Sequence, residues 1–362
     1  MMDTERVNQG RWLIYGANGY TGELIAREAV KRGLSPILAG RSKGAIESLA
    51  AELGLEGRVF ALDTHKAIVH ALRDASVVLH CAGPFSATSA PMIKACLDAK
   101  VHYLDISGEI DVFEHAHSLN DVAQRAGVVL CPGVGFDVIP TDCVAAALKQ
   151  AMPDAISLAL GFDSRSGFSP GTAKTSIEGL AKGGRVRSQG LIVAVPLGHR
   201  QRQIDFGEGV KTAVTISWGD VSTAFHSTGI PNIEVYMPMP PRMIKQLKRL
   251  NLIRPLLGLS FVQKLLQRRV GKTIKGPGQA KRDASPTHVW GEVVNAKGER
   301  CTARIQTVNG YSLTITGSLA VVQHLLAQPA QAGGAFTPSG LVGLDLVTRL
   351  PGSGKMVMTS ST

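Results

Sequence analysis

The first residues that could do chemistry form a glycine-rich turn near the N-terminus, Gly16-Ala-Asn-Gly19-Tyr-Thr-Gly22. The turn joins an apolar run of strand length to a stretch with helical spacing. Glycines at such a turn let the backbone approach a pyrophosphate, and the positive end of the helix stabilises the phosphate charge. The G-x-x-G-x-x-G spacing departs from G-x-G-x-x-G and is weak alone, but its setting favours a dinucleotide site over a tight turn without a ligand. The residues predicted to bind the dinucleotide here are Gly16, Asn18, Gly19, Tyr20, Thr21 and Gly22.

The residues after the second apolar run decide which dinucleotide fits. NAD-binding proteins usually carry an acidic residue there for a ribose hydroxyl, whereas an arginine suits the 2′-phosphate of NADP. Arg41 and Ser42 occupy this place, so we expect NADP, with NAD the less favoured cofactor. A solvated arginine at a turn is the alternative. Asp63, after the third run, either touches the adenine edge or caps the next helix, and both interpretations stay open.

A third turn, Cys81-Ala82-Gly83-Pro84-Phe85, ends the fourth apolar run. The carboxyl ends of parallel strands meet at one edge of a sheet, where ligands of open α/β folds bind. The small residues Ala82, Gly83 and Pro84 would let the ribose and the nicotinamide pass. A simple Gly-Pro turn is the alternative.

Hydride transfer needs an acceptor carbon held against the nicotinamide and a donor for the accompanying proton. Glu109, just after the fifth run, is the first choice for a polar contact there, and N-capping of a helix from Ile110 is its alternative. Tyr103 is a second candidate, but it alternates with His102 along a strand, so only one of the two can face the cleft. Asp137 either caps the helix after it or reaches the cofactor pocket.

A polar, glycine-rich loop over residues 164–175 is the expected substrate lid. Its Lys174 could donate to a substrate oxygen, and an ordinary surface lysine is the alternative. No metal site is expected, because Glu114, His115 and His117 lack the H-E-x-x-H spacing.

The elements that must position these residues follow from the pattern of apolar runs. In the first 137 residues, runs of strand length alternate with helical stretches, which is typical of βαβ units on a parallel sheet. We therefore predict an α/β protein in which residues 1–137 form a Rossmann-type, doubly wound dinucleotide-binding domain. The predicted strands are 12–15, 37–39, 58–62, 76–82, 101–106 and 128–130, and helices are expected over 43–53, 65–73, 90–99 and 110–125.

The pattern changes after Pro140, where strand-like runs mostly lack intervening helices. This favours a mainly antiparallel sheet in a second, α+β domain over residues 138–320, used for substrate binding and dimerisation. Residues 321–362 are expected to return to the first domain as helices. The predicted strands of the second domain are 156–162, 191–196, 213–217, 233–237, 289–295, 301–307 and 311–316.

Five ordered motifs resemble the saccharopine dehydrogenase-like oxidoreductase family. They are the turn that starts at Gly16, Ala39-Gly-Arg41-Ser, Cys81-Ala-Gly-Pro-Phe, His102-Tyr-Leu-Asp105-Ile-Ser-Gly108-Glu109 and Gly135-Phe-Asp137-Val-Ile-Pro140. The resemblance implies a nucleotide-binding domain, a second α/β domain, a return of the C-terminus to the first domain, and NADP in many members. The family includes amino-acid-type dehydrogenases that reduce an imine and trans-acting enoyl reductases that reduce a C=C bond of polyketide-like lipids. This chain is more similar to the lipid-type branch.

Together these features predict an NADP-dependent oxidoreductase that transfers hydride to a C=C or C=N bond of a hydrophobic small molecule. Two alternatives remain: a non-catalytic NADP-binding sensor or scaffold, and an amino-acid-type dehydrogenase.

The charge of the chain is concentrated in one segment. The 362 residues carry a net charge of +11, and their composition excludes a disordered tail, a collagen-like repeat or a small disulfide scaffold. Between Glu234 and Asp283 there are twelve Lys and Arg residues and no acidic residue, which leaves the rest of the chain close to neutral. A basic amphipathic segment is predicted over 240–282, with Met243, Ile244, Leu247 and Leu250 on one helical face.

Three interpretations of this segment compete. It is a cover helix with solvated charges, a contact with an anionic membrane or a lipid substrate, or a nucleic-acid site. Nucleic acid is not expected, because Phe261 is the segment's one aromatic residue and base stacking needs several.

The remaining predictions concern setting and partners. The five cysteines form no C-x-x-C pair, the polar N-terminus lacks a signal-peptide core, and no run of 18 apolar residues occurs. We therefore expect a cytoplasmic protein, with a peripheral membrane contact left open. The expected partners are a small hydrophobic substrate and a second copy of the chain in a homodimer.

Overall fold

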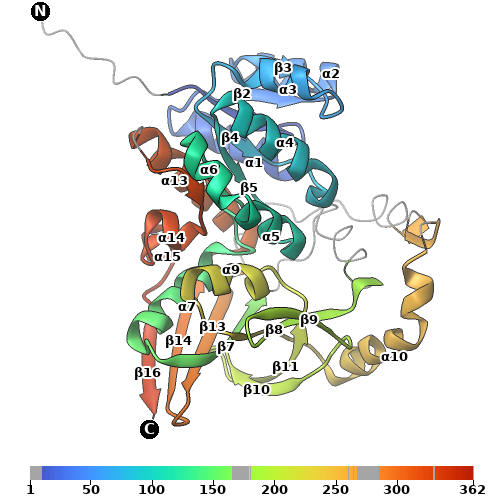
Figure 1. Ribbon diagram of the computed structural model, residues 1–362, viewed down its shortest axis with the longest axis vertical. Coiled ribbons are helices and arrows are strands. Elements are labelled where there is room, and N and C mark those ends of the chain that lie inside the picture. The colour runs from blue at the N-terminus through green and yellow to red at the C-terminus, as the bar shows by residue number, and fades with distance from the viewer. Residues whose placement is uncertain are drawn as a thin grey trace, which may run out of the picture.

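The structure is a computed structural model that describes residues 10–164, 179, 181–259, 261–263, 265–266, 285–328 and 331–361. Figure 1 shows two sheets with helices around them, one above the other. The upper sheet is built mainly from the N-terminal part of the chain, and the lower one from its middle and late parts.

The first sheet has seven parallel strands in the order β15-β6-β5-β4-β1-β2-β3. Six of them have the 3-2-1-4-5-6 order of a dinucleotide-binding fold, so the Rossmann-type prediction is confirmed. The strands β1, β2 and β4 are apolar because both faces of the sheet are covered. The strands are β1 (Trp12–Tyr15), β2 (Ile37–Gly40), β3 (Gly57–Val59), β4 (Val77–His80), β5 (His102–Asp105), β6 (Val129–Cys131) and β15 (Gly334–Ala335). The helices between them are α1 (Tyr20–Lys31), α2 (Lys43–Leu53), α3 (His65–Leu72), α4 (Phe85–Ala99), α5 (Ile110–Ser118) and α6 (Asn120–Ala126).

The second sheet is mainly antiparallel, as predicted, with one parallel pair between β7 and β12. Its main path runs β10-β11-β12-β7-β13-β14-β16, and the β8-β9 hairpin pairs with β12. The strands are β7 (Ala155–Ser164), β8 (Gly184–Ser188), β9 (Leu191–Val195), β10 (Gln201–Asp205), β11 (Val210–Ile216), β12 (Asn232–Pro238), β13 (Thr287–Asn295), β14 (Arg300–Thr307) and β16 (Val357–Ser361). The helices are α7 (Ile139–Ala151), α9 (Asp220–Thr228) and α10 (Pro241–Leu257). The edge strands of the main path are β10 and β16. A dimer formed by pairing strands of this sheet would use one of these edges.

The C-terminal part of the chain crosses between the two sheets. It contains α13 (Gly310–Ala327), α14 (Pro338–Val342) and α15 (Leu346–Arg349). The helix α13 packs against α1 and β4, and β15 pairs with β6, so this part returns to the first domain as the resemblance implied. The last strand, β16, instead pairs with β14 of the second sheet. The expectation that residues 321–362 return as helices alone is therefore corrected.

One strand prediction is wrong. Residues 311–316 were expected to form a strand because β-branched and apolar residues alternate there, but they form the first turns of α13. The side chain of Asn309 accepts hydrogen bonds from the backbone N–H groups of Tyr311 and Ser312, at 2.7 and 3.2 Å, and so starts a helix. The cap and the burial of Leu313 outweigh the strand propensity of the threonines.

The two domains share one apolar core. A single buried cluster joins Ile14 and Leu104 of the first sheet to Val144 of α7 and to Leu160 and Val293 of the second sheet. The relative position of the two sheets is thus set by packed side chains.

Candidate cofactor site and active site

The glycine loop of residues 16–19 lies between β1 and α1, at the carboxyl edge of the first sheet. Gly16 has a φ of +82°, and a Cβ there would lie 2.8 Å from the Ala82 backbone. A Cβ on Gly22 would lie 2.3 Å from the Gly16 carbonyl oxygen. These two glycines are therefore required by the fold itself, because the loop, the helix and the turn after β4 approach so closely.

Gly19 differs from the other two. Its φ of −83° is ordinary, and the nearest atom to a Cβ there is the Gly16 carbonyl oxygen, at 3.2 Å. Gly19 is also the N-cap of α1, and no side chain caps the helix there. The fold makes a weaker demand for glycine at this position, and an uncapped helix end stabilises a phosphate. The loop therefore fits a pyrophosphate in front of Gly19.

The other predicted loop residues surround this position. Asn18 is exposed, and its Oδ1 lies against Gly40 at the end of β2. Tyr20 and Thr21 are half-buried in the first turn of α1. The Tyr20 ring meets that of Tyr311 edge-on, with 5.3 Å between centroids.

Arg41 and Ser42 follow β2 at the same edge, and both are exposed. Ser42 is the N-cap residue of α2, but its side chain makes no capping hydrogen bond. Within the described part of the chain, no ion pair involves Arg41. A guanidinium, a hydroxyl and an uncapped helix end together suit the 2′-phosphate of NADP. NADP therefore fits the residues present.

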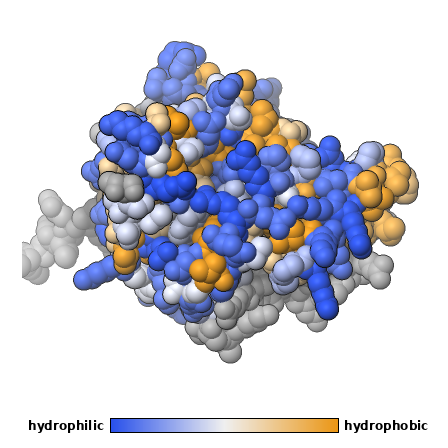
Figure 2. Space-filling model, turned by 90° about the horizontal axis from the view of Figure 1, so that it is seen from below, coloured by the Kyte–Doolittle hydropathy of each residue, from blue (hydrophilic) through white to orange (hydrophobic). Residues whose placement is uncertain are grey.

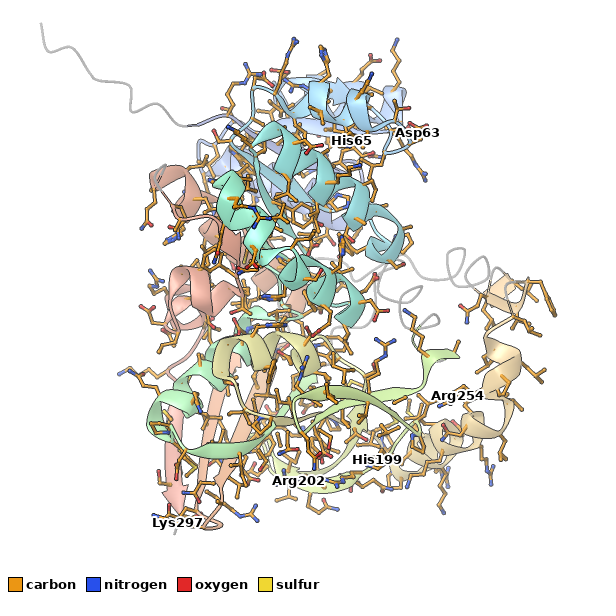
Figure 3. The ribbon with its side chains drawn as sticks, viewed as in Figure 1. Asp63, His65, His199, Arg202, Arg254 and Lys297 are labelled. Carbon is orange, nitrogen blue, oxygen red and sulfur yellow. The ribbon has the colours of Figure 1, made fainter. Side chains whose placement is uncertain are left out.

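Asp63 is exposed, close to His65 at the top of the molecule (Figure 3). Burial raises the pKa of the Tyr15 phenol, and the charge of Asp63 raises it further, so Asp63 lies near that group. The Arg41 charge acts on the same phenol in the opposite direction, so both residues stand near the end of β1. The N-cap of α3 is Thr64, one residue later, and no side-chain hydrogen bond caps that helix. The capping alternative for Asp63 thus has no support, and contact with adenine stays a prediction.

The turn after β4 is held from both sides. The Cys81 N–H donates to the Tyr15 carbonyl at 2.8 Å, and the Thr88 hydroxyl donates to the Ala82 carbonyl at 2.7 Å. Gly83 is exposed and is joined to Pro84 by a cis peptide bond. Residues 82–84 therefore form a fixed ledge beside the glycine loop, where the predicted path of the ribose and nicotinamide lies.

Glu109 has a different partner from the one expected. Its carboxylate accepts hydrogen bonds from the backbone N–H groups of Phe85 and Ser86, at 3.0 and 2.7 Å. It therefore caps α4, directly after Pro84. Although Glu109 is the N-cap residue of α5, its side chain makes no capping bond to that helix. The capping alternative at Ile110 is corrected to a cap on α4, and the predicted contact with the nicotinamide stays a prediction.

Tyr103 is fully buried, and its hydroxyl donates to Asp105 at 2.7 Å. Asp105 also accepts from the N–H groups of Ser107 and Gly133, and burial raises its pKa to about 6. The position of Tyr103 inside the core does not favour it as a proton donor to a substrate. His102 accepts a hydrogen bond from the Val129 N–H at 3.0 Å. Neither Tyr103 nor His102, the two neighbouring residues on β5, is therefore directed to the cofactor edge. Lys174, the third catalytic candidate, lies outside the described residues.

Asp137 lies next to Gly108, at the end of the loop that follows β5. A Cβ on Gly108 would lie 2.7 Å from Asp137 Oδ2, so the carboxyl rests directly on this glycine, one residue before Glu109. Burial raises the pKa of Asp137 to about 7. Its backbone carbonyl accepts from the Trp218 indole N–H at 3.0 Å, which ties this loop to the second domain. The carboxyl thus lies one residue from Glu109, whose own carboxylate caps α4 directly after the ledge at 82–84.

Two further aspartates lie near Asp137 and were missed by sequence reasoning. Asp142 accepts from the Ser227 hydroxyl and from the Ser339 N–H, so it joins α7, α9 and α14. Asp220 is fully buried, and the Thr141 side chain lies beside its carboxyl. Burial, and then the charges of Asp142 and Asp137, raise the pKa of Asp220 well above its usual range.

A line of aromatic side chains connects the glycine loop to the second sheet. Tyr311 lies against Tyr20 and directly follows Gly310, which lies against the Phe136 ring. Phe136 meets Phe162 at 5.6 Å, and Phe162 meets Trp218 at 4.8 Å between centroids. Except for buried Phe162, these side chains are partly exposed. The surroundings of Asp137 are therefore largely aromatic.

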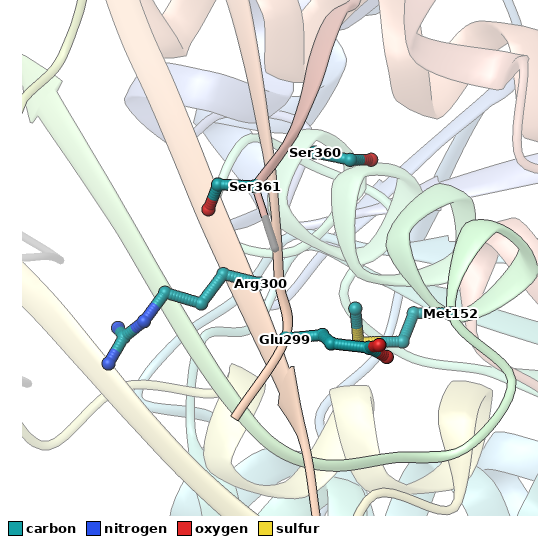
Figure 4. Close-up of a pocket in the computed structure, with 5 residues that line it drawn as sticks. All are labelled: Met152, Glu299, Arg300, Ser360 and Ser361. Carbon is teal, nitrogen blue, oxygen red and sulfur yellow. The ribbon is translucent and has the colours of Figure 1, made fainter. Parts of the chain in front are cut away.

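Two shallow pockets lie away from this edge. One is lined by Met152, Glu299, Arg300, Ser360 and Ser361 at the end of the second sheet (Figure 4). The other lies at the opposite, amino edge of the first sheet, beside Arg11 and Pro36. Neither contains a residue of the candidate site. Among the described residues, no group of three or more His, Cys, Asp or Glu side chains could hold a metal ion.

Comparison with known proteins agrees with this geometry. Residues 12–131 match the model of the saccharopine dehydrogenase NADP binding domain. A saccharopine dehydrogenase-like oxidoreductase of Bos taurus is 31% identical over 150 residues, which cover 36% of this chain and 35% of that protein. A Mycobacterium tuberculosis protein named as a trans-acting enoyl reductase is 27% identical over 185 residues, which cover 47% of this chain and 44% of that protein.

These matches span about a third to under a half of the length of the curated relatives. Among solved structures, apo saccharopine dehydrogenase (L-Glu forming) from Saccharomyces cerevisiae has the same fold, with a TM-score of 0.64 and 12% identity, covering 98% of this chain and 100% of that chain. The resemblance to the saccharopine dehydrogenase-like oxidoreductases is confirmed, and residues 12–131, which match the saccharopine dehydrogenase NADP binding domain, carry it.

Proposed function

We propose that this chain is an NADP-dependent oxidoreductase that transfers hydride to a C=C or C=N bond of a hydrophobic small molecule. The observation that carries the proposal is the Asp137 carboxyl. Burial raises its pKa to about 7, and it rests on Gly108, one residue before the Glu109 side chain that caps α4 after the ledge at 82–84. A carboxyl that is partly protonated at neutral pH, next to the expected nicotinamide position, suits general acid catalysis.

The chemistry assigns one role to each part of the site. A bound nicotinamide supplies the hydride that forms the new C–H bond at the acceptor carbon. As the double bond is reduced, its electron pair takes a proton at the partner atom, and Asp137 donates that proton and becomes a carboxylate. The loop at Gly19 and the pair Arg41 and Ser42 hold the phosphates, while the ledge orients the reactive end. Asp137 regains its proton from solvent.

The aromatic line supports an apolar acceptor. Phe136, Phe162 and Trp218 lie against the loop that carries Asp137 and offer no charge to a polar substrate. An amino-acid-type substrate needs cations for its carboxylates. The nearby cations Lys182 and Arg185 are both paired with Asp111, which disfavours that alternative.

The test is oxidation of NADPH with a panel of enoyl thioesters and cyclic imines. We expect Asp137→Asn to lower turnover about 10²- to 10⁴-fold with NADPH affinity unchanged. Gly108→Ala should also lower turnover, because the added methyl group displaces the carboxyl. Asp121→Asn, on the exposed face of α6, is the matched control. Since the donor must be protonated, kcat/KM should fall as pH rises above about 7.

Two results would count against the proposal. Full turnover by Asp137→Asn would remove the proton-donor role. Tight NADPH binding without turnover of any acceptor in the panel would favour the sensor alternative.

A further inference from the structure

The helix α10 is attached to the second domain along one side. Ile244 is buried, and the Asn251 side chain donates to the Leu197 carbonyl and accepts from its N–H, at 3.1 and 2.8 Å. Leu247, Leu250 and Arg254 are half-buried on the same side. The predicted amphipathic helix is therefore present, and packing and these two hydrogen bonds fix its buried side. Met243, which was predicted to lie on the same apolar face, is instead 51% exposed.

The opposite side of α10 exposes large apolar side chains at its C-terminal end. Leu252 is 85% exposed and Leu256 is 59% exposed, and Ile253 lies beside them. The apolar surface continues beyond the helix with Leu259 and with Phe261, which is 69% exposed. Soluble surfaces rarely gather so many large apolar side chains in one place, so this patch is expected to have an apolar partner.

Cations flank this apolar patch and carry no counter-charge. Arg242, Lys245, Lys248 and Arg249 are exposed, and none forms an ion pair within the described part of the chain. Residues 235–282 contain no Asp or Glu. At 100° per residue, Arg242, Lys245 and Arg249 project on the same side as Leu252 and Leu256. Figure 2 shows the result, with long blue side chains next to an orange patch at the right-hand edge, where Figure 1 places α10.

We propose that α10 docks this face on an anionic lipid surface. The cations of the first half would lie at the headgroups, while Leu252, Ile253 and Leu256 enter the boundary with the acyl chains. No described helix is long and apolar enough to cross a membrane, so the contact is peripheral. The docking goes beyond the proposed hydride transfer and uses none of its residues.

A second copy of the chain is a weaker candidate for the same face. A symmetric contact would bring the four cations of one copy against those of the other, with no acidic residue on α10 to offset them. Nucleic acid would meet the charge, but Phe261 is the one exposed aromatic ring described beside the helix. Anionic lipid meets both the charge and the apolar patch.

Co-sedimentation of the full chain with vesicles tests the proposal. We expect binding to vesicles of phosphatidylcholine mixed with phosphatidylserine, weakening with added salt, and little binding to phosphatidylcholine alone. Each cation contributes about fivefold to partitioning. Lys245→Glu with Arg249→Glu should therefore lower binding by more than about tenfold, and Leu252→Ser with Leu256→Ser should also lower it.

The matched control is Lys94→Glu with Lys297→Glu, two exposed lysines on α4 and in the β13–β14 turn, which should bind like the native chain. NADPH titration of every variant reports folding independently of lipid. The proposal is wrong if the native protein does not bind anionic vesicles, or if the α10 variants bind them as well as the control does. A native dimer that Leu252→Ser dissociates, without any vesicle binding, would assign the face to a second copy instead.

Discussion

We expect one side chain, Arg41, to determine the preference for NADP over NAD. It stands exposed after β2 beside an uncapped helix, so a 2′-phosphate would give it the counter-charge it lacks. We expect Arg41→Asp to weaken NADPH binding at least about tenfold and to remove or reverse the preference over NADH. Fluorescence titration with both cofactors measures this, with Arg73→Asp at the far end of α3 as the control. Equal affinity of the native protein for the two cofactors would contradict the assignment.

Substitutions at Gly19 and Gly22 distinguish an effect on cofactor binding from an effect on folding. A Cβ at position 19 would lie 3.2 Å from the Gly16 carbonyl oxygen, a tight contact that a small shift relieves, and valine would occupy the space in front of the helix end. Gly19→Val should therefore abolish NADPH binding with a smaller change in melting temperature than Gly22→Ala. Alanine at position 22 would meet the Gly16 carbonyl oxygen at 2.3 Å, so Gly22→Ala should lower the melting temperature. Unchanged NADPH titration of Gly19→Val would refute the placement of the pyrophosphate.

Single residues were predictable where local chemistry decides their role. The glycine turn and Arg41 could be assigned because strand, turn and helix follow one another in sequence. The partner of Glu109 could not, since it is the start of a helix 24 residues earlier that only the sheet order brings close. For Asp137 the sequence left two roles open, because its burial depends on Gly108 and Trp218 from other elements.

At the scale of elements, Glu109 joins the end of β5 to the start of α4. Its carboxylate serves two N–H groups at a positive helix end, so Glu109→Ala should lower the free energy of unfolding by about 1–2 kcal/mol. Glu109→Gln keeps one acceptor and should lose less. Urea unfolding measures both variants. Unchanged stability together with lost turnover would restore the direct catalytic role predicted from the sequence.

Most elements of the first sheet could be predicted because each apolar run is bounded by a turn. The error at residues 311–316 shows the limit of alternation as a signal. A six-residue pattern of apolar and β-branched residues fits a strand or a buried helix equally well, and the Asn309 cap decided between them.

At the scale of the whole molecule, α5 adds polar contacts between the two domains to the apolar core that they share. Glu114 accepts from Arg187 at 2.7 Å and from Ser222 at 2.6 Å, both from the second domain. The His226 ring, followed by Ser222 and Arg187, lowers the pKa of Glu114 to about 2. Because this pKa lies below the unfolded value of about 4.3, the stabilisation is complete above that pH and is lost as pH falls toward 2.

We therefore expect Glu114→Gln to be less stable than the native chain at pH 7 by about 1 kcal/mol, a figure reduced for the 42% exposure of the side chain. The difference should shrink as pH falls from about 4.3 toward 2. Urea unfolding across this range measures it, and Asp121→Asn serves as the control. A difference that stays constant with pH would contradict the charge-based account.

The late part of the chain gives the last prediction, because it completes the first sheet. The helix α13 packs against α1 and β4, and β15 pairs with β6, although both come from beyond residue 309. A chain ending at residue 309 keeps the whole glycine loop and Arg41, yet it should lose NADPH binding, since the positive end of α1 is no longer supported. A chain ending at residue 355 loses only β16 from the second sheet and should still bind NADPH. Circular dichroism melting and NADPH titration compare the two chains. Unchanged affinity in the shorter chain would mean that the residues before 310 are sufficient to form the cofactor site.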